Sequence, residues 1–289
     1  MPRLAYVNGR YTPLAEAAVH IEDRGYQFAD GVYEVVAILN GRPLDWQPHL
    51  DRLAYSLGEL GIAPPMDARA FDQVARHLLA RNGARDALLY VQVTRGVARR
   101  DHAFPAARPA LVMTVRPFSF AGRWRAAQAG AGVALVPDER WARPDIKSIS
   151  LLPNVLAKEA ARQAGAFEAW MVDRDGHVTE GSSTNAWIVT DGGTVVTRPR
   201  GRAILAGVMR ATLMRLAGEG VAIEERAFTP AQAQGAAEAF LTSTTNPCLP
   251  VVAIDGQPVG DGAPGPVTRR LRDLVWAEIG RQTGWRPPG

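Results

Sequence analysis

The sequence predicts an α+β protein of two domains. Its 289 residues exceed the length that one hydrophobic core usually serves, and 47% hydrophobic with 21% charged residues is typical of a globular chain. Predicted strands and helices follow one another without the strict alternation of a doubly wound sheet. The sequence changes character at 118–123, so we expect a small N-terminal α/β domain at 1–117, a connector at 118–123 and a large C-terminal domain at 124–289.

Turn residues and apolar periodicity define the elements of the first domain. Asn8 and Gly9 stand between two short apolar runs and predict a hairpin over residues 6–11. From His49 the apolar residues recur at helical spacing until Gly61, which predicts an amphipathic helix. The other expected elements are a strand at 32–39 followed by an Asn-Gly turn, a helix at 67–81, and strands at 88–95 and 110–116.

The second domain continues with strands and helices in mixed order. A glycine at 207 precedes an amphipathic run and marks a helix start near that residue. We expect strands at 132–136, 168–173, 185–190, 221–227 and 239–243, and helices at 154–164, 206–218 and 266–281.

Composition excludes several classes of function. No apolar stretch approaches the roughly 20 residues of a membrane span, and the N-terminus lacks the apolar segment of a signal peptide. One cysteine, Cys248, rules out an internal disulfide framework and fits a reducing cytoplasm. The net charge is +4, but the arginines are scattered and not interleaved with aromatic residues, which argues against nucleic-acid binding. We therefore expect a cytoplasmic protein that neither spans a membrane nor binds nucleic acid.

Only two of the 33 basic residues are lysines, Lys147 and Lys158. A lysine amine can lose its proton and form a Schiff base with a carbonyl compound, whereas a guanidinium group stays charged and unreactive. Lys158 lies within a predicted helix beside Glu159 and is expected to be a solvated helical lysine. Lys147 lies between an apolar run and the next helix, and is the candidate for a reactive amine.

Four further segments could carry chemistry, although each alone is more often structural. Glu180 precedes Gly-Ser-Ser and can present a carboxylate to a ring nitrogen. The helix start at Gly207 offers free N–H groups suited to a phosphate, and the hydroxyl run at 242–246 can also face one. Arg52 and His49 lie three residues apart on one helical face, where an arginine can add a charge-assisted contact to a phosphate.

The joint order of these segments resembles the fold-type IV pyridoxal-phosphate aminotransferases. This family includes branched-chain aminotransferases, D-amino-acid aminotransferases and aminodeoxychorismate lyases. The resemblance runs from Val7 to about Trp276, and the segments at 31–34 and 94–102 are most similar to the D-amino-acid branch. It implies a two-domain α+β architecture, in which a larger C-terminal domain with a mixed, β-barrel-like core follows a small N-terminal α/β domain.

The resemblance also implies a cofactor, pyridoxal 5'-phosphate, and a role for each matching residue. Lys147 would hold the cofactor covalently and then move the Cα proton of the substrate, and Glu180 would keep the pyridine nitrogen protonated. Leu205 would pack against the ring, and the resemblance calls for no metal ion. The residues implied to contact the cofactor are Arg52, Lys147, Glu180, Ser183, Leu205, Val208, Met209 and Thr244, of which Arg52, the amides of Val208 and Met209, and the Thr244 hydroxyl would bind the phosphate.

One position departs from the family pattern. Similar chains often carry threonine where this sequence has Met209, and methionine cannot donate a hydroxyl hydrogen bond to phosphate. We therefore expect weaker retention of the cofactor rather than loss of activity.

The resemblance implies a D-amino acid such as D-alanine as amino donor and 2-oxoglutarate as acceptor. In D-specific relatives the α-carboxylate is bound by residues that match Tyr33, Arg100 and His102, and Arg99 competes with Arg100 for this role. The alternatives are a branched-chain L-amino-acid aminotransferase, an aminodeoxychorismate lyase, and a non-catalytic basic binding protein. The resemblance further implies a homodimer, with the loop of Arg100 and His102 available to either subunit.

Overall fold

The computed structural model describes residues 3–288, except the side chain of Glu219. By contacts between residues the chain forms two compact units. Unit 1 contains the chain up to Ser119 together with two later segments, Ile146–Ser150 and Gln282–Trp285. Unit 2 contains Phe120–Asp145 and Leu151–Arg281. The segment of Lys147 therefore packs with unit 1, although it lies far along the sequence.

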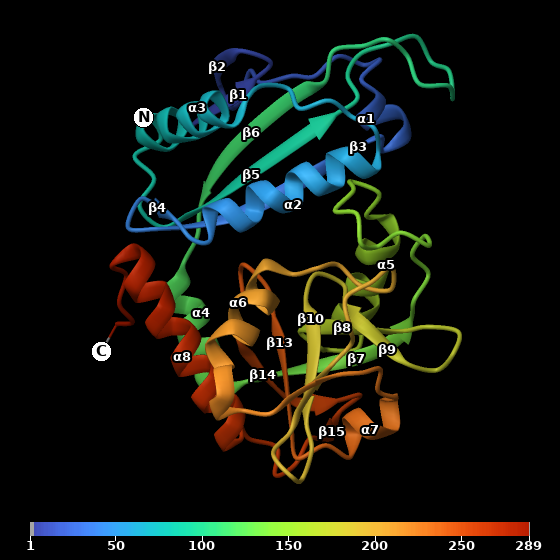
Figure 1. The fold of residues 1–289 in the computed structure, drawn as a ribbon, viewed down its shortest axis with the longest axis vertical. Helices are drawn as coiled ribbons and strands as arrows, with labels where there is room; N and C mark the ends of the chain where they lie inside the picture. The colour runs from blue at the N-terminus through green and yellow to red at the C-terminus, as the bar shows by residue number, and fades with distance from the viewer. Residues whose placement is uncertain (1–2, 289) are drawn as a thin grey trace. The chain divides into compact units, whose positions relative to one another are not determined.

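Unit 1 is built on a six-stranded sheet with the strand order β2-β1-β6-β5-β3-β4, and every neighbouring pair is antiparallel (Figure 1). Asn8 and Gly9 both have positive φ in the turn of the first hairpin, as the Asn-Gly signal predicts. The strands are β1 (Leu4–Val7), β2 (Arg10–Pro13), β3 (Gly31–Leu39), β4 (Arg42–Pro43), β5 (Ala87–Thr94) and β6 (Ala110–Pro117).

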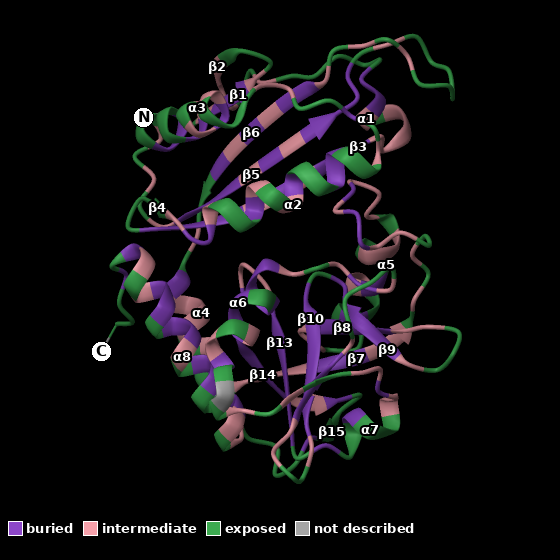
Figure 2. Ribbon diagram, in the orientation of Figure 1, coloured by how far each residue is buried: buried purple, intermediate pink, exposed green. Residues whose placement is uncertain are grey.

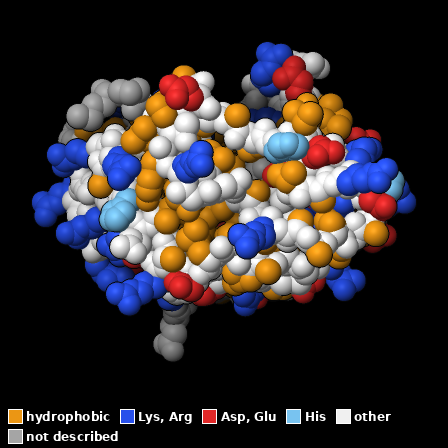
Figure 3. Space-filling model, turned by 90° about the horizontal axis from the view of Figure 1, so that it is seen from above, with side chains coloured by type: hydrophobic (Ala, Val, Ile, Leu, Met, Phe, Trp, Pro, Cys, Tyr) orange, Lys and Arg blue, Asp and Glu red, His pale blue; other side chains and the backbone are white. Residues whose placement is uncertain are grey.

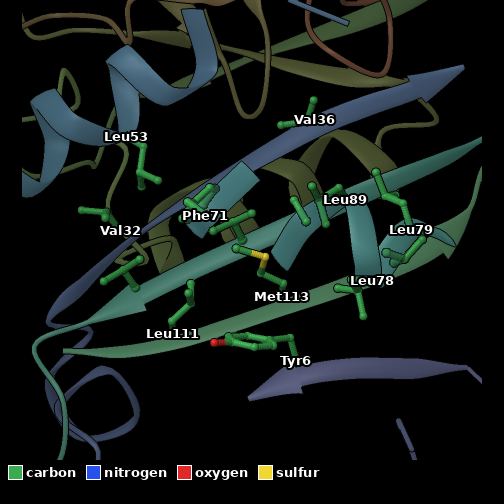
Figure 4. Packing of buried hydrophobic residues seen from close by; sticks show 14 of the residues in the cluster. Tyr6, Val32, Val36, Leu53, Phe71, Leu78, Leu79, Leu89, Leu111 and Met113 are labelled. Carbon is green, nitrogen blue, oxygen red and sulfur yellow. The ribbon is translucent and has the colours of Figure 1, made fainter. Parts of the chain in front are cut away.

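Helices α2 (Trp46–Glu59) and α3 (Ala68–Arg81) cover one face of this sheet. Asp67 caps α3, because its side chain accepts a hydrogen bond from the Ala70 amide at 2.8 Å. The alternation of strand side chains places Val32 and Val36 of β3 on the helix-covered face. Figure 4 shows how the residues of this core pack together; Leu53 comes from α2, Phe71, Leu78 and Leu79 from α3, and Tyr6, Val32, Val36, Leu89, Leu111 and Met113 from the sheet.

Unit 2 is built on a nine-stranded mixed sheet. Its order is β12-β11-β10-β13-β14-β7-β8-β9, with β15 beside β14, and β9 also lies against β10, so the sheet is strongly curled. The strands are β7 (Ala131–Pro137), β8 (Glu168–Val172), β9 (Val178–Gly181), β10 (Asn185–Val189), β11 (Val195–Thr197), β12 (Ile223–Glu225), β13 (Glu238–Thr242), β14 (Leu249–Ile254) and β15 (Gln257–Pro258).

The middle strands of unit 2 are buried along their whole length, notably β10 and β13 (Figure 2). Strands covered on both faces show no polar–apolar alternation, and in these two strands three or four successive apolar residues are all buried. Trp170 and Trp187 are among the largest fully buried side chains. The helices of unit 2 are α4 (Phe120–Ala129), α5 (Leu152–Gln163), α6 (Val208–Ala217), α7 (Pro230–Gln234) and α8 (Pro266–Thr283), the last of which ends in residues that pack with unit 1.

The structure confirms the main predicted helices and strands, with ends shifted by a few residues. Sequence reasoning missed the short elements α1 (Arg24–Phe28), β9, β11, β14 and α7. The stretch 118–123, expected as a connector, includes the first turn of α4. No helix among residues 3–288 is long and apolar enough to span a membrane. Figure 3 shows one face of the molecule, on which basic side chains are dispersed among acidic and apolar ones.

Candidate active site

The main chain around Lys147 runs along the start of β3 as an additional short antiparallel bridge. The Tyr33 amide donates to the Lys147 carbonyl at 3.0 Å, and the Ile149 amide donates to the Gly31 carbonyl at 3.0 Å. The Lys147 amide donates to Ser56 Oγ of α2 at 3.1 Å. Main-chain hydrogen bonds to β3 and to Ser56 of α2 thus fix the backbone of Lys147.

The amine of Lys147 lies over an aromatic pair on the sheet face opposite the apolar core. Its Nζ is 4.2 Å from the centre of the Tyr33 ring, and that ring stacks on Tyr90 with 5.7 Å between centroids. Burial, with a smaller effect of Tyr33, raises the pKa of Tyr90 to about 12, so its phenol keeps its proton at neutral pH. Glycine at position 31 lets β3 lie close to β5, because a Cβ there would lie 2.7 Å from the Val93 carbonyl oxygen.

Arg52 forms part of a buried cluster between β3 and α2. Its Nε and Nη2 each donate to one oxygen of Glu34 at 2.8 Å, and His49 Nδ1 lies 2.7 Å from Glu34 Oε2. Burial alone would raise the pKa of Glu34, but the charge and hydrogen bonds of Arg52 and His49 lower it to about 2. Glu34 is therefore ionised, and its two-pronged contact fixes the plane of the Arg52 guanidinium.

Arg100 and His102 lie on the β5–β6 loop (95–109) and meet around one aromatic ring. The Arg100 Cζ atom is 4.5 Å from the centre of the Phe28 ring, and the His102 ring is 5.5 Å from it. Both side chains are otherwise exposed, as is Arg99. The two residues predicted to bind substrate together are thus neighbours, while no contact among the described residues joins them to Tyr33.

In unit 2, Glu180 sits at the end of β9 with a buried carboxylate. Arg140 Nη1 and the Leu205 amide, at 3.0 Å, donate to its Oε1, and Asn185 Nδ2 donates to its Oε2 at 2.9 Å. Arg140 is itself held by Asp138 through its Nε at 2.9 Å and its Nη2 at 2.7 Å. Although burial would lower the pKa of Arg140, the carboxylates of Asp138 and Glu180 raise it, so Arg140 stays charged.

The start of α6 is packed directly against this carboxylate cluster. Asn185 Nδ2 also donates to the Leu205 carbonyl at 3.1 Å, and a Cβ at Gly207 would lie 2.0 Å from Asn185 Oδ1. Only glycine lets the helix begin this close to Asn185. Gly207 caps α6 without a side-chain hydrogen bond, so the first amides of the helix, at Val208 and Met209, point out of its end.

Ser183 is engaged by a buried acid that sequence reasoning did not single out. The hydroxyls of Ser182 and Ser183 both donate to Glu168, the latter at 2.9 Å. Lys158 is 3.6 Å from the same carboxylate and donates to the Phe167 carbonyl. Lys158 lies within α5, as predicted, and its side chain is 44% exposed, although its amine also contacts the segment before β8.

The remaining predicted cofactor contacts also lie in unit 2. Thr244 is half-buried in the turn after β13, where the Ser243 amide donates to the Asn246 carbonyl at 2.8 Å. Val208 and Met209 are buried at the start of α6. Within unit 2, Leu205 and Glu180 are joined by a hydrogen bond.

Sequence reasoning missed Arg140, Asn185 and Glu168. Asn185 ends the segment Glu-Gly-Ser-Ser-Thr-Asn, so its closeness to Glu180 in the sequence was the available signal. Arg140 and Glu168 gave no local signal, because their partners Glu180 and Ser183 lie 40 and 15 residues away.

The chemistry of these groups fits pyridoxal 5'-phosphate. Glu180 is a buried carboxylate paired with Arg140, and a carboxylate is the partner that a protonated ring nitrogen requires. The start of α6, whose glycine cap offers no side-chain hydrogen bond, suits a phosphate group, and Lys147 supplies the amine that a covalently held aldehyde needs.

Comparison with known proteins agrees with this interpretation. A family model for class IV amino-transferases matches residues 31–254. A D-alanine aminotransferase of Bacillus licheniformis is 41% identical over 96% of this chain and 97% of its own. One from Staphylococcus aureus (strain MSSA476) is 36% identical over 93% of this chain and 95% of its own.

Solved structures share the fold. The branched-chain amino acid aminotransferase of Escherichia coli has a TM-score of 0.90 at 23% identity and covers 98% of this chain and 96% of its own. That of Thermoproteus uzoniensis, solved with norvaline, has a TM-score of 0.87 at 24% identity and covers 98% of this chain and 95% of its own. The fold is that of the fold-type IV enzymes, as predicted. The chain thus belongs to the class IV aminotransferases and is a pyridoxal-phosphate-dependent transaminase.

Proposed function

We propose that this chain is a D-amino-acid transaminase. It transfers the amino group of a D-alanine-like donor to 2-oxoglutarate and yields a 2-oxo acid and D-glutamate. The observation that carries the proposal is the 41% identity to a D-alanine aminotransferase over 96% of the chain. The pairing of Arg100 and His102 around Phe28 supports it, because two donors held together suit a carboxylate.

Lys147 and Glu180 perform the chemical work in this proposal. The cofactor, when bound, supplies an electron-withdrawing ring that stabilises the charge left at Cα when a proton is removed. The Lys147 amine takes the proton from Cα of the donor and delivers it to the cofactor carbon that carried the aldehyde, not back to Cα. Glu180, oriented by its ion pair with Arg140, would keep the proton on the ring nitrogen and so maintain the withdrawing power of the ring.

The substrate carboxylate is bound by Arg100, His102 and Tyr33. Arginine offers a planar pair of donors that match both carboxylate oxygens, and histidine and tyrosine add single donors. Because Lys147 moves the proton on one fixed face, the side on which the carboxylate is bound decides which enantiomer reacts. The position of the Lys147 amine over the Tyr33 ring supports a shared site for these two residues.

The phosphate is bound by residues of several elements. Glu34 fixes the Arg52 guanidinium by its two-pronged contact, which supports a pre-oriented phosphate donor. The start of α6 adds main-chain amides and the positive end of the helix dipole. The proposed cofactor contacts are Arg52, Ser183, Leu205, the amides of Val208 and Met209, and Thr244.

We further propose a cytoplasmic homodimer in which the β5–β6 loop serves an active site. Exposed apolar side chains on this loop and near α1, including Phe104 at 70% and Tyr26 at 76% exposure, support a surface that becomes covered. Burial raises the pKa of the Cys248 thiol, so this free cysteine stays protonated and inert, in keeping with a reducing compartment.

A branched-chain L-amino-acid aminotransferase is the second candidate, because the solved structures above carry that name. Turnover of each donor with 2-oxoglutarate, followed by chiral chromatography of the glutamate formed, separates the two. The proposal expects D-glutamate from D-alanine and no product from L-leucine. L-glutamate formed from L-leucine would overturn it in favour of the branched-chain enzyme.

A further inference from the structure

A buried arginine at the start of α1 has no part in the roles proposed above. Arg24 is 3% exposed, and its Nε donates to Asp30 Oδ2 at 2.7 Å. Its Nη1 donates to the main-chain carbonyl of Asp101. Asp101 separates Arg100 from His102 in the sequence, so a buried cation holds the backbone between the two residues proposed to bind the substrate.

A second buried arginine, Arg95, binds the carboxylate of Asp30 together with Arg24. Arg95 donates to both oxygens of the same carboxylate, from Nε to Asp30 Oδ2 at 2.8 Å, the oxygen that also accepts from Arg24, and from Nη2 to Asp30 Oδ1 at 3.0 Å. Burial would raise the pKa of Asp30, but the hydrogen bonds and charges of Arg95 and Arg24 lower it, so the carboxylate is ionised between two cations. The Arg95 guanidinium also lies 3.6 Å from the centre of the Phe104 ring, further along the β5–β6 loop.

The base of the β5–β6 loop is fixed separately, by main-chain hydrogen bonds. The Arg24 amide donates to the Gly96 carbonyl at 2.9 Å, and the Ala98 amide donates to the Glu22 carbonyl at 3.3 Å. Gly96 has a φ of +98°, and a Cβ there would lie 1.9 Å from the Arg108 carbonyl oxygen. Only glycine therefore fits where the two ends of the loop approach each other. The side chain of Arg24 is therefore needed for the far part of the loop and not for its base.

Arg24 lies next to the Phe28 ring, which both residues proposed to bind the substrate also contact. Arg24 Cζ is 4.8 Å from the centre of the Phe28 ring, which is also approached by Arg100 and His102. These two side chains are exposed on a loop, where long side chains otherwise sample many rotamers. Their shared ring contact orients the side chains only while the loop backbone stays in place.

We infer that Arg24 is a positioning residue for the α-carboxylate of the substrate. Through the Asp101 carbonyl it fixes the backbone from which Arg100 and His102 project, so that substrate binding does not have to order that backbone. The inference rests on the proposed function, because it concerns the carboxylate that these two residues would bind. Arg24 touches neither substrate nor cofactor in this account.

The test compares holoenzyme of the wild type, Arg24→Gln and Arg24→Lys with D-alanine and 2-oxoglutarate. Both variants are expected to raise the KM for D-alanine about tenfold and to change kcat by less than about twofold, because the carboxylate contact is made equally in ground and transition states. Lysine keeps the charge beside Asp30 and preserves folding, but one ammonium group cannot reach Asp30 and the Asp101 carbonyl with two fixed prongs.

A matched control is available in unit 2. Arg272 is also buried, donates to an aspartate (Asp273, 3.0 Å) and to a main-chain carbonyl (Ala127, 3.1 Å), and lies outside the proposed machinery. Arg272→Gln should lower stability as Arg24→Gln does, yet leave the KM for D-alanine within about twofold of the wild type.

A double-mutant cycle and a protease assay separate positioning from general destabilisation. In an Arg100→Ala background, Arg24→Gln should raise KM much less than in the wild type, because the two changes act through one contact. Tryptic cleavage after Arg99 and Arg100, followed by mass spectrometry, should be faster in both Arg24 variants and unchanged in the Arg272 control.

An unchanged KM in folded Arg24→Lys, a full KM effect persisting in the Arg100→Ala background, or unchanged tryptic cleavage would each overturn the inference. A wild-type protein that does not turn over D-alanine would instead refute the proposed function, and the cleavage assay would still decide whether Arg24 holds the loop.

Discussion

Replacing Glu34 with glutamine tests the buried cluster that orients Arg52. The wild-type carboxylate has a pKa of about 2 against its usual 4.5. One pKa unit corresponds to about 1.4 kcal/mol, so ionised Glu34 contributes on the order of 3 kcal/mol to the free energy of unfolding at pH 7. Removing one partner of a buried pair costs a similar amount, about 3–5 kcal/mol, and the Arg52 side chain is only 10% exposed.

The sign of the pH dependence follows from the direction of the pKa change. A carboxyl group with a lowered pKa in the folded state stabilises the protein above pH 4.5, and this contribution is lost as the pH falls toward 2. Wild type and Glu34→Gln should therefore differ by about 3 kcal/mol at pH 7 and converge progressively below pH 4.5. Urea unfolding at fixed cofactor concentration, repeated at several pH values, measures this difference.

A matched control lies on the surface of α5. Glu159 has the same lowered pKa of about 2, because Arg162 holds it by a similar two-pronged contact, but this pair is solvent-exposed. Solvent screens such pairs, so Glu159→Gln should change the free energy of unfolding little. A loss below about 1 kcal/mol in Glu34→Gln at pH 7, or a loss that does not shrink on acidification, would refute the reasoning.

Three further predictions concern the proposed active site. Lys147→Ala should abolish transfer and remove the visible absorption of the bound cofactor while the circular dichroism of the fold is retained; residual turnover near wild type would reassign the base. Arg100→Ala should raise the KM for D-alanine at least tenfold more than Arg99→Ala, since only one of them lies over Phe28, and equal effects in steady-state kinetics would mean that the carboxylate site is misassigned. Met209→Thr should lower the cofactor dissociation constant about fivefold by adding one hydroxyl donor, as equilibrium dialysis would measure, and an unchanged constant would count against the role of this position.

Elements defined by local patterns could be predicted from the sequence. The hairpin at Asn8 and Gly9 and the capped helix after Asp67 follow from turn and capping chemistry within a few residues. The short strand β9 could not be recognised, because its four residues run directly into a polar turn. Helix α4 was not predicted, because its aromatic, glycine and arginine residues form no clear amphipathic pattern.

In the candidate site, too, some residues could be predicted from the sequence and others could not. Lys147 and Glu180 could be proposed from residue chemistry and from the resemblance of the ordered segments. The residues that contact these two side chains could not be predicted, because such contacts depend on which strands become neighbours in the fold. Arg140 meets Glu180 across 40 residues, and Arg24 meets the Asp101 carbonyl across 77. The contact of Lys158 with Glu168 could not be predicted for the same reason, because it arises only when α5 packs beside β8.

The most direct test of the central claim is a single half-reaction on the purified holoenzyme. The visible absorption band of the bound cofactor is followed while D-alanine is added to one sample and L-leucine to another. The account predicts that the band bleaches with D-alanine and stays unchanged with L-leucine. Bleaching with L-leucine alone would contradict it, and would return Arg100 and His102 to the status of loop residues with no part in binding substrate.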